Sequence, residues 1–242
     1  MRQKLRHTCI RNLYVVSLKR GDRIMKIKAA IFDMDGTLID SLFLWDVFWR
    51  EAGIRFLNNP DFRPSEEDDK AVRTIPLRDA MYLIHDHYGL AKDGEELFAY
   101  VNGIITDFYA NQVQLKPGAR QWLDHCKSQG IRMCIASATA PELIRLAMNH
   151  CDIAQYFETV LSCATIGKGK ECPDIYLAAQ KHFGLTADEI CVFEDSLVAI
   201  ETAIGIGMHT VAIYDRFNFG QERMAQIAGA YIAKGETLEK LI

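Results

Sequence analysis

The sequence lacks the features that mark membrane-spanning, disulfide-stapled or repetitive proteins. No stretch of eighteen apolar residues occurs in its 242 residues, so we expect no membrane span. The seven cysteines are scattered with no C-x-x-C pair, and an odd number fits a reduced interior better than a disulfide framework. No internal repeat or low-complexity segment is present. We therefore predict a cytoplasmic protein that is long enough to bury a large core.

Acidic residues outnumber basic residues outside the first 24 residues. That segment carries seven basic residues against the single acid Asp22, whereas the whole chain has 28 basic and 32 acidic residues. The remaining body therefore carries 21 basic and 31 acidic residues, a formal charge of −10. A negative body argues against nucleic acid and acidic membrane surfaces as partners.

The basic segment, residues 1–24, is interpreted as an N-terminal extension that the fold does not need. Its apolar stretch, Leu13 to Val16, is too short for a signal peptide, and no small-residue cleavage site follows it. The arginine content leaves a transit peptide as the alternative. Met25 begins the segment that leads into the first apolar strand.

Apolar, β-rich runs alternate with helical patterns along most of the chain. Pro117-Gly118 opens one helical pattern, and Thr139 with Glu142 has capping-box spacing ahead of another. Such alternation predicts parallel strands joined by right-handed crossovers, hence an α/β, doubly wound, Rossmann-like sheet. The predicted strands are Ile27 to Asp33, Ile131 to Ala136, Thr159 to Ser162, Ile190 to Glu194 and Thr210 to Ile213.

The alternation stops for about eighty residues after the first strand. Helical patterns run from Leu42 to Ala52, from about Glu66 to Tyr88 with an interruption at Pro76, and from Glu95 to Ala110. An all-helical insert at this point would lie over the crevice at the carboxyl ends of the strands. The predicted domains are a core of residues 25–41 and 113–242 and a helical cap of residues 42–112.

Two carboxylates lie two residues apart where the first strand gives way to a glycine. Residues i and i+2 of a strand point the same way, so Asp33 and Asp35 can converge on one small volume. Like charges so close together favour a bound cation, and carboxylate oxygens suit Mg²⁺. A solvated Asp-Gly turn is the alternative interpretation of the pair alone.

Three further loops that follow strands or precede helices carry reactive or charged groups. Ser137 and Thr139 follow the second strand and either bind an anion at a helix N-terminus or cap that helix. Lys170 precedes a predicted helix, and the dipole of a helix does not stabilise a cation at that end. We therefore predict that Lys170 binds phosphate. Glu194 and Asp195 end a strand that reads as buried.

Taken together, these segments resemble the haloacid dehalogenase superfamily, in the branch with a helical cap after the first strand. That branch includes β-phosphoglucomutase and many small-metabolite phosphatases. The resemblance runs from about Lys26 to the C-terminus and implies an α/β core with an inserted all-helical cap. The segments similar to its four motifs are Asp33-x-Asp35-Gly36-Thr37, Ser137, Lys170 with Pro173-Asp174, and Glu194-Asp195-Ser196.

The resemblance implies a Mg²⁺-dependent phosphatase that acts on a small phosphorylated metabolite, with a sugar phosphate as one candidate. Asp33 would attack phosphorus and form an aspartyl phosphate, and Asp35 would serve as general acid and base. The implied metal ligands are Asp33, Asp35 through its backbone carbonyl, Glu194 and Asp195; Ser137, the Ala138 amide and Lys170 would hold the phosphoryl oxygens. The expected partner is a small phosphate ester, and the expected state is a monomer or weak homodimer.

Two departures from the family pattern bear on the reaction. The histidine that follows the second aspartate by ten residues in β-phosphoglucomutases is Trp45 here, so mutase activity is the alternative and hydrolysis the leading interpretation. Glu171 takes the place after Lys170 where proline is common; it either weakens substrate binding or points to solvent. Candidate substrate contacts in the cap are Trp45, Arg73 and Arg78. A non-catalytic binding protein on the same fold is a further alternative, against which the intact set of motif residues argues.

A chain that begins at Met25 tests the interpretation of the first 24 residues. We expect it to stay soluble and to keep the activity of the full-length protein, because the motif residues all lie beyond that position. The comparison is made by expressing both chains, comparing their soluble yield and measuring phosphate release. An insoluble or inactive shorter chain contradicts the interpretation.

Overall fold

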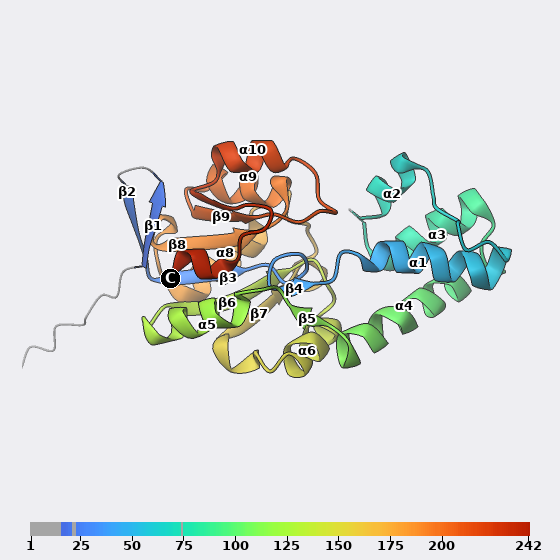
Figure 1. Ribbon diagram of the computed structural model, residues 1–242, viewed down its shortest axis with the longest axis horizontal. Coiled ribbons are helices and arrows are strands. Elements are labelled where there is room, and N and C mark those ends of the chain that lie inside the picture. The colour runs from blue at the N-terminus through green and yellow to red at the C-terminus, as the bar shows by residue number, and fades with distance from the viewer. Residues whose placement is uncertain (1–15, 21–22, 74) are drawn as a thin grey trace, which may run out of the picture.

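A parallel β-sheet forms the centre of the protein (Figure 1). The computed structural model describes residues 16–20, 23–73 and 75–242, and within them six strands pair in the order β10-β9-β8-β3-β6-β7, all parallel. The strands are β3 (Ala29–Phe32), β6 (Arg132–Ser137), β7 (Thr159–Ser162), β8 (Ile190–Glu194), β9 (His209–Ile213) and β10 (Ala230–Ile232).

Helices cover both faces of this sheet because its central strands are apolar on both sides. In β3, Ala30 and Phe32 belong to the hydrophobic core beneath α5 (Ala119–Ser128) and α6 (Pro141–His150). Ala29 and Ile31 face the opposite core, under α8 (Asp174–Phe183) and α9 (Leu197–Gly205). The predicted doubly wound α/β sheet is therefore confirmed. Shorter helical elements are η2 (Ala154–Tyr156), α7 (Cys163–Ile166), η3 (Ala187–Glu189), α10 (Gln221–Ile227) and η4 (Leu238–Leu241).

The segment between β3 and α5 contains the predicted all-helical cap. Its elements are α1 (Leu44–Ala52), the π-helical turn η1 (Gly53–Leu57), α2 (Glu66–Val72), α3 (Leu77–Tyr88) and α4 (Gly94–Asn111). Local signals set several ends: Ser65 and Asp93 accept hydrogen bonds from the N–H groups of Asp68 and Glu96 at the starts of α2 and α4. Gly89, with a φ of +69°, ends α3 in the left-handed region.

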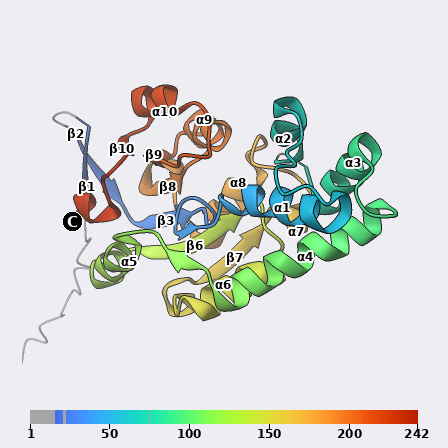
Figure 2. The same ribbon diagram turned by 45° about the vertical axis from the view of Figure 1, so that its right-hand side comes forward.

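Two short strands join the cap to the sheet. These are β4 (Ile39–Asp40) and β5 (Gln114–Leu115), which pair antiparallel where the chain leaves the core and returns to it. From the far end of the cap, α4 runs back to pack against α6, as Figures 1 and 2 both show. The cap therefore projects beyond the carboxyl ends of β3, β6 and β8, on the side where strand-end loops meet.

The N-terminal side of the sheet carries a feature that the sequence analysis did not predict. Strands β1 (Val16–Arg20) and β2 (Arg23–Ile27) pair antiparallel, and Met25 lies inside β2. The predicted boundary after residue 24 thus crosses a strand pair, and the dispensability of residues 1–24 stays a prediction. The basic residues at positions 2, 4, 6 and 11 lie outside the described residues. Across the described part of the chain, no helix has the length and apolar character needed to cross a membrane.

Candidate active site

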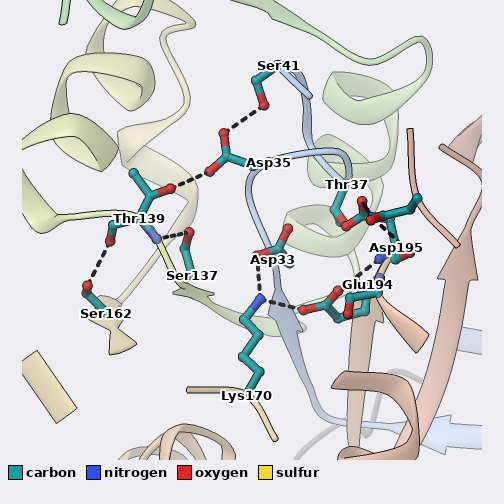
Figure 3. Close-up of polar contacts among 12 residues, drawn as sticks. Asp33, Asp35, Thr37, Ser41, Ser137, Thr139, Ser162, Lys170, Glu194 and Asp195 are labelled. Carbon is teal, nitrogen blue, oxygen red and sulfur yellow. Dashed lines mark hydrogen bonds and ion pairs between the residues drawn. The ribbon is translucent and has the colours of Figure 1, made fainter. Parts of the chain in front are cut away.

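Acids from two neighbouring strands meet at the carboxyl edge of the sheet (Figure 3). In the register of the central strands, Phe32 lies beside Phe193, so Asp33, which follows β3, lies beside Glu194, the last residue of β8. The backbone N–H of Asp33 donates to the carbonyl of Phe193 at 3.0 Å and extends the ladder by one residue. The sheet itself therefore fixes the separation of the first two acids.

Lys170 lies between these two acids. Its ammonium group donates to Asp33 Oδ1 and to Glu194 Oε1, and the side chains of Lys170, Asp33 and Glu194 are 12%, 8% and 1% exposed. The other oxygen of Glu194 accepts from the backbone N–H groups of Asp195 at 2.9 Å and Ser196 at 3.0 Å. Such buried, charge-assisted contacts hold the ammonium group and both carboxylates in one arrangement.

Asp195 completes the acidic group and is held from two sides. Its Oδ1 accepts from the Thr37 hydroxyl at 2.9 Å, and its Oδ2 accepts from the side-chain amide of Asn218. Gly36 passes so close that a Cβ there would lie 2.1 Å from Asp195 Oδ2, and its φ is +80°. A glycine is required at this point of the loop on both grounds.

The three carboxylates are suited to a divalent cation. Ligand oxygens of Asp33, Glu194 and Asp195 lie within 4.8 Å of one another, and all three residues are buried. Burial raises the pKa of Asp33 to about 7, although the Lys170 ammonium opposes this rise. Burial, together with repulsion from Asp33 and Glu194, raises the pKa of Asp195 well above its usual value. The Lys170 ammonium contacts two of these three carboxylates, which leaves negative charge that a bound metal would balance.

Lys170 stays charged in this setting. Burial works to lower the pKa of Lys170, but the adjacent carboxylates of Asp33 and Glu194 outweigh it and hold that pKa well above the usual value. The residue therefore brings a permanent positive charge to the position beside Asp33.

The side chain of Asp35 points away from the three clustered acids (Figure 3). Its Oδ1 accepts from the Ser41 hydroxyl at 2.7 Å and from the Tyr109 hydroxyl, and its Oδ2 accepts from the Thr139 hydroxyl at 2.7 Å. A role for Asp35 as a metal ligand through its backbone carbonyl stays a prediction.

The capping box predicted at Thr139 is wrong. Helix α6 begins at Pro141 with Ala140 before it, and no side chain caps this helix end. The Thr139 hydroxyl donates instead to Asp35. The Thr139 hydroxyl, which local spacing assigned to the cap of α6, therefore binds the carboxylate of Asp35 from another strand-end loop.

The remaining motif residues occupy the same edge of the sheet. Ser137 is 1% exposed, and its hydroxyl oxygen accepts from the Thr139 N–H at 3.1 Å, while the next residue, Ala138, is exposed. Glu171 is exposed, which favours the solvent-facing alternative considered for it.

The structure separates the three cap candidates. The Arg73 guanidinium lies 5.4 Å from the ring centre of Trp45, so these two residues are neighbours. Arg78 instead pairs with Glu95 and lies 4.2 Å from the ring centre of Phe98, with a side chain that is 53% exposed. Of the three candidates, Trp45 and Arg73 are therefore in contact with each other, whereas Arg78 contacts other residues.

Comparisons with known proteins decide the family. A model of the haloacid dehalogenase-like hydrolases matches residues 27–207. This chain belongs to the haloacid dehalogenase-like hydrolases. The matched segment spans β3, the whole cap, the strand ends that carry Asp33, Glu194 and Asp195, and the loop before α8 that carries Lys170.

Individual relatives are distant but similar over most of their length. A phosphorylated carbohydrates phosphatase of Thermotoga maritima is 24% identical over 217 residues, covering 89% of this chain and 98% of the relative. Hexitol phosphatase B of Escherichia coli K12 is 25% identical over 188 residues, covering 78% and 84%. A crystal structure of β-phosphoglucomutase from Clostridium difficile superposes with a TM-score of 0.65 at 18% identity, covering 89% of this chain and 95% of that one. The structural likeness supports the fold.

Sequence reasoning missed several contacts of this hydrolase site. Asn218 lies in the loop after β9, so the rule that strand-end loops carry functional groups could have found it. Lys116 follows β5 and donates to the Gly36 carbonyl and, at 2.7 Å, to the buried Asp215. Tyr109 lies on an amphipathic cap helix, where its spacing is typical of a core residue and gives no signal.

The raised pKa of Asp33 predicts a pH-dependent effect of Asp33→Asn on stability. In the unfolded chain Asp33 ionises near 3.8, but in the folded protein it ionises near 7. Its charge therefore destabilises the fold increasingly from about pH 4 to pH 7, and fully above pH 7, by about 1.4 kcal/mol for each unit of pKa difference. With a chelator present, we expect Asp33→Asn to raise the melting temperature at pH 8 more than at pH 5. Equal shifts at both pH values contradict the prediction.

The contact of Asn218 with Asp195 predicts a role in metal affinity. Groups that orient a metal ligand typically contribute tenfold or more to affinity, so we expect Asn218→Ala to weaken Mg²⁺ binding about tenfold. Calorimetric titration of the chelator-treated protein measures this directly. The matched control is Asn149→Ala, at an exposed position of α6, which we expect to bind Mg²⁺ as the parent does. Equal affinity for the two variants overturns the prediction.

Proposed function

We propose that this hydrolase is a Mg²⁺-dependent phosphatase of a small phosphorylated sugar or polyol. The observation that carries the proposal is the buried arrangement of Asp33, with Lys170 in direct contact and two further carboxylates beside it. The names of the two distant relatives, a phosphorylated carbohydrates phosphatase and a hexitol phosphatase, support the substrate class.

Asp33 is the proposed nucleophile. One of its carboxylate oxygens attacks phosphorus, the bond from phosphorus to the leaving oxygen breaks, and an aspartyl phosphate forms. Asp33, Glu194, Asp195 and the backbone carbonyl of Asp35 would hold Mg²⁺, which when bound neutralises charge on the carboxylates and the phosphoryl group. Lys170, already next to Asp33, supplies positive charge where the phosphoryl oxygens arrive.

Asp35 is the proposed general acid and base. In the first displacement it gives a proton to the leaving alkoxide. In the second it takes a proton from the water that attacks the aspartyl phosphate, so phosphate leaves and Asp33 is regenerated. Because hydroxyl groups now hold the Asp35 carboxylate away from Asp33, these contacts must change before the proton can move. Ser137 and the Ala138 amide complete the proposed binding of the phosphoryl oxygens.

Mutase chemistry is the alternative on the same site. It requires the phosphorylated Asp33 to transfer its group to a second sugar phosphate before water attacks. Trp45 has no proton-accepting nitrogen like that of the histidine found at this position in mutases, so hydrolysis is favoured. A cytoplasmic location and a monomeric or weakly dimeric state also stay predictions.

Phosphate release tests the proposal directly. With Mg²⁺, we expect the purified protein to release inorganic phosphate from p-nitrophenyl phosphate and from sorbitol 6-phosphate, and a chelator to abolish release. Asp33→Asn should lower kcat at least about 10³-fold, because the nucleophile is lost. The exposed Asp188 provides the matched control, since Asp188→Asn should keep full activity.

Two results would reject the proposal in different ways. Isomerisation of a hexose 1-phosphate primed by a bisphosphate, without net phosphate release, establishes the mutase. No turnover of any ester by the parent, with Asp33→Asn unchanged, establishes the non-catalytic binding protein.

A further inference from the structure

Four cap residues form a compact polar and aromatic group, here called the cap cluster: Trp45, Trp49, Asp69 and Arg73. Arg73 donates from Nε at 3.0 Å and from Nη2 at 2.8 Å to one oxygen of Asp69, and the indole N–H of Trp49 donates to the other at 2.8 Å. The two indole rings lie 5.7 Å apart, and the guanidinium covers the ring of Trp45. The Arg73 and Asp69 side chains are 17% and 25% exposed.

The α1 side of the cap cluster lies next to the connection from the active site. Ser41, whose hydroxyl binds Asp35, precedes Trp45 by four residues. Between them, Leu42 packs so close to Gly36 that a Cβ on Gly36 would lie 2.8 Å from its Cδ1. Trp45 therefore lies in the first turn of α1, shortly after the loop that carries Asp33 and Asp35.

The α2 side of the cap cluster is linked to the other flank of the same site by a neighbouring lysine. Lys70 lies 5.0 Å from the ring centre of Phe219, in the loop that reaches from β9 toward α2 (Figure 1). The residue before Phe219 is Asn218, which holds Asp195. Arg73 follows Lys70 by three residues, so both lie on the same side of α2. The cap cluster is thus connected along α1 to the loop of Asp35 and, through the contact of Lys70 with Phe219, to the loop that holds Asp195.

The two basic side chains on this side of α2 are each paired with an acid of the same helix. Arg73 is matched by Asp69, and Lys70 is matched by Glu66 at 2.5 Å. A ligand carboxylate or second phosphate at the cap cluster would lose its water and meet positive and negative charge at once. A hydroxyl group loses less on desolvation, and the guanidinium N–H groups that do not face Asp69 can donate to it.

We propose that the cap cluster selects phosphate esters whose remaining part is uncharged and hydroxyl-bearing, and disfavours those with a second negative charge. The proposal rests on the proposed phosphatase function and adds to it which leaving groups are accepted. Asp69 is the residue that sets the selectivity, because it cancels the charge of Arg73.

Sorbitol 6-phosphate and 6-phosphogluconate are the matched probes, since they share chain length and differ at the far end by a hydroxymethyl group or a carboxylate. Selectivity is the ratio of their kcat/KM values, or of their inhibition constants against p-nitrophenyl phosphate where either is turned over too slowly. We expect the parent to favour sorbitol 6-phosphate by about tenfold or more.

Asp69→Asn keeps the shape of the side chain and an oxygen for Trp49 while it releases the charge of Arg73. We expect this variant to shift the ratio about tenfold toward 6-phosphogluconate, and Arg73→Gln in the Asp69→Asn background to reverse the shift. Glu67→Gln removes the same charge from an exposed position of the same helix and should leave the ratio unchanged. If Asp69→Asn does not fold, Arg73→Gln alone should move the ratio further toward sorbitol 6-phosphate.

A parent that prefers 6-phosphogluconate overturns the proposal, and so does a ratio that no variant of Asp69 or Arg73 changes. Both results leave the phosphatase function standing, because phosphate release from p-nitrophenyl phosphate is measured in the same experiment. Absence of all phosphate release, from every ester and in every variant, rejects the function itself.

Discussion

The buried excess of negative charge at the carboxyl edge of the sheet is the constraint on which the site depends. Asp33, Glu194 and Asp195 are buried with ligand oxygens within 4.8 Å of one another, and Lys170 contacts the first two. Such charge is costly to bury unless it is compensated, and carboxylates buried together in this way are typical of functional sites. Thr37, Asn218 and the backbone N–H groups around Glu194 hold the carboxylates in place despite their repulsion.

The sequence predicted this part of the site because the ends of the strands can be located from the local sequence, and in a parallel sheet those ends come together. Short apolar runs alternating with helices imply a parallel sheet, and parallel strands bring their carboxyl ends to one edge. That rule alone predicts that Asp33 and Glu194 lie at the same edge of the sheet, and in the structure their strands are direct neighbours. A phosphate-binding role for Lys170 was predicted from its place before a helix, but its contact with Asp33 was not, because its loop follows α7 rather than a strand.

The contacts that sequence reasoning missed or misassigned all depend on where separate segments meet. Thr139 has the spacing of a helix cap, yet its hydroxyl bonds to a carboxylate 104 positions earlier in the chain. Tyr109 looks like a core residue of a helix, and the pairing of β4 with β5 is too short to leave a pattern. Asp69 and Arg73 lie four residues apart, so helical spacing alone could have predicted that they pair. Whether the pair can affect a substrate depends on which face α2 turns toward the core, and the sequence does not give that face.

The placement of the cap explains why Asp35, rather than Asp33, is tied to it. Asp33 continues the ladder of β3 and is fixed by the sheet, whereas Asp35 lies in the loop from which the chain leaves for the cap. Its carboxylate is held by Tyr109 from cap helix α4, by Ser41 next to β4 and by Thr139 from the core. Any movement of α4 relative to α6 must therefore alter the surroundings of Asp35 while the charged cluster on the sheet stays in place. In the proposed mechanism, attack on phosphorus would therefore depend on a residue fixed by the sheet, and proton transfer on a residue held partly by the cap.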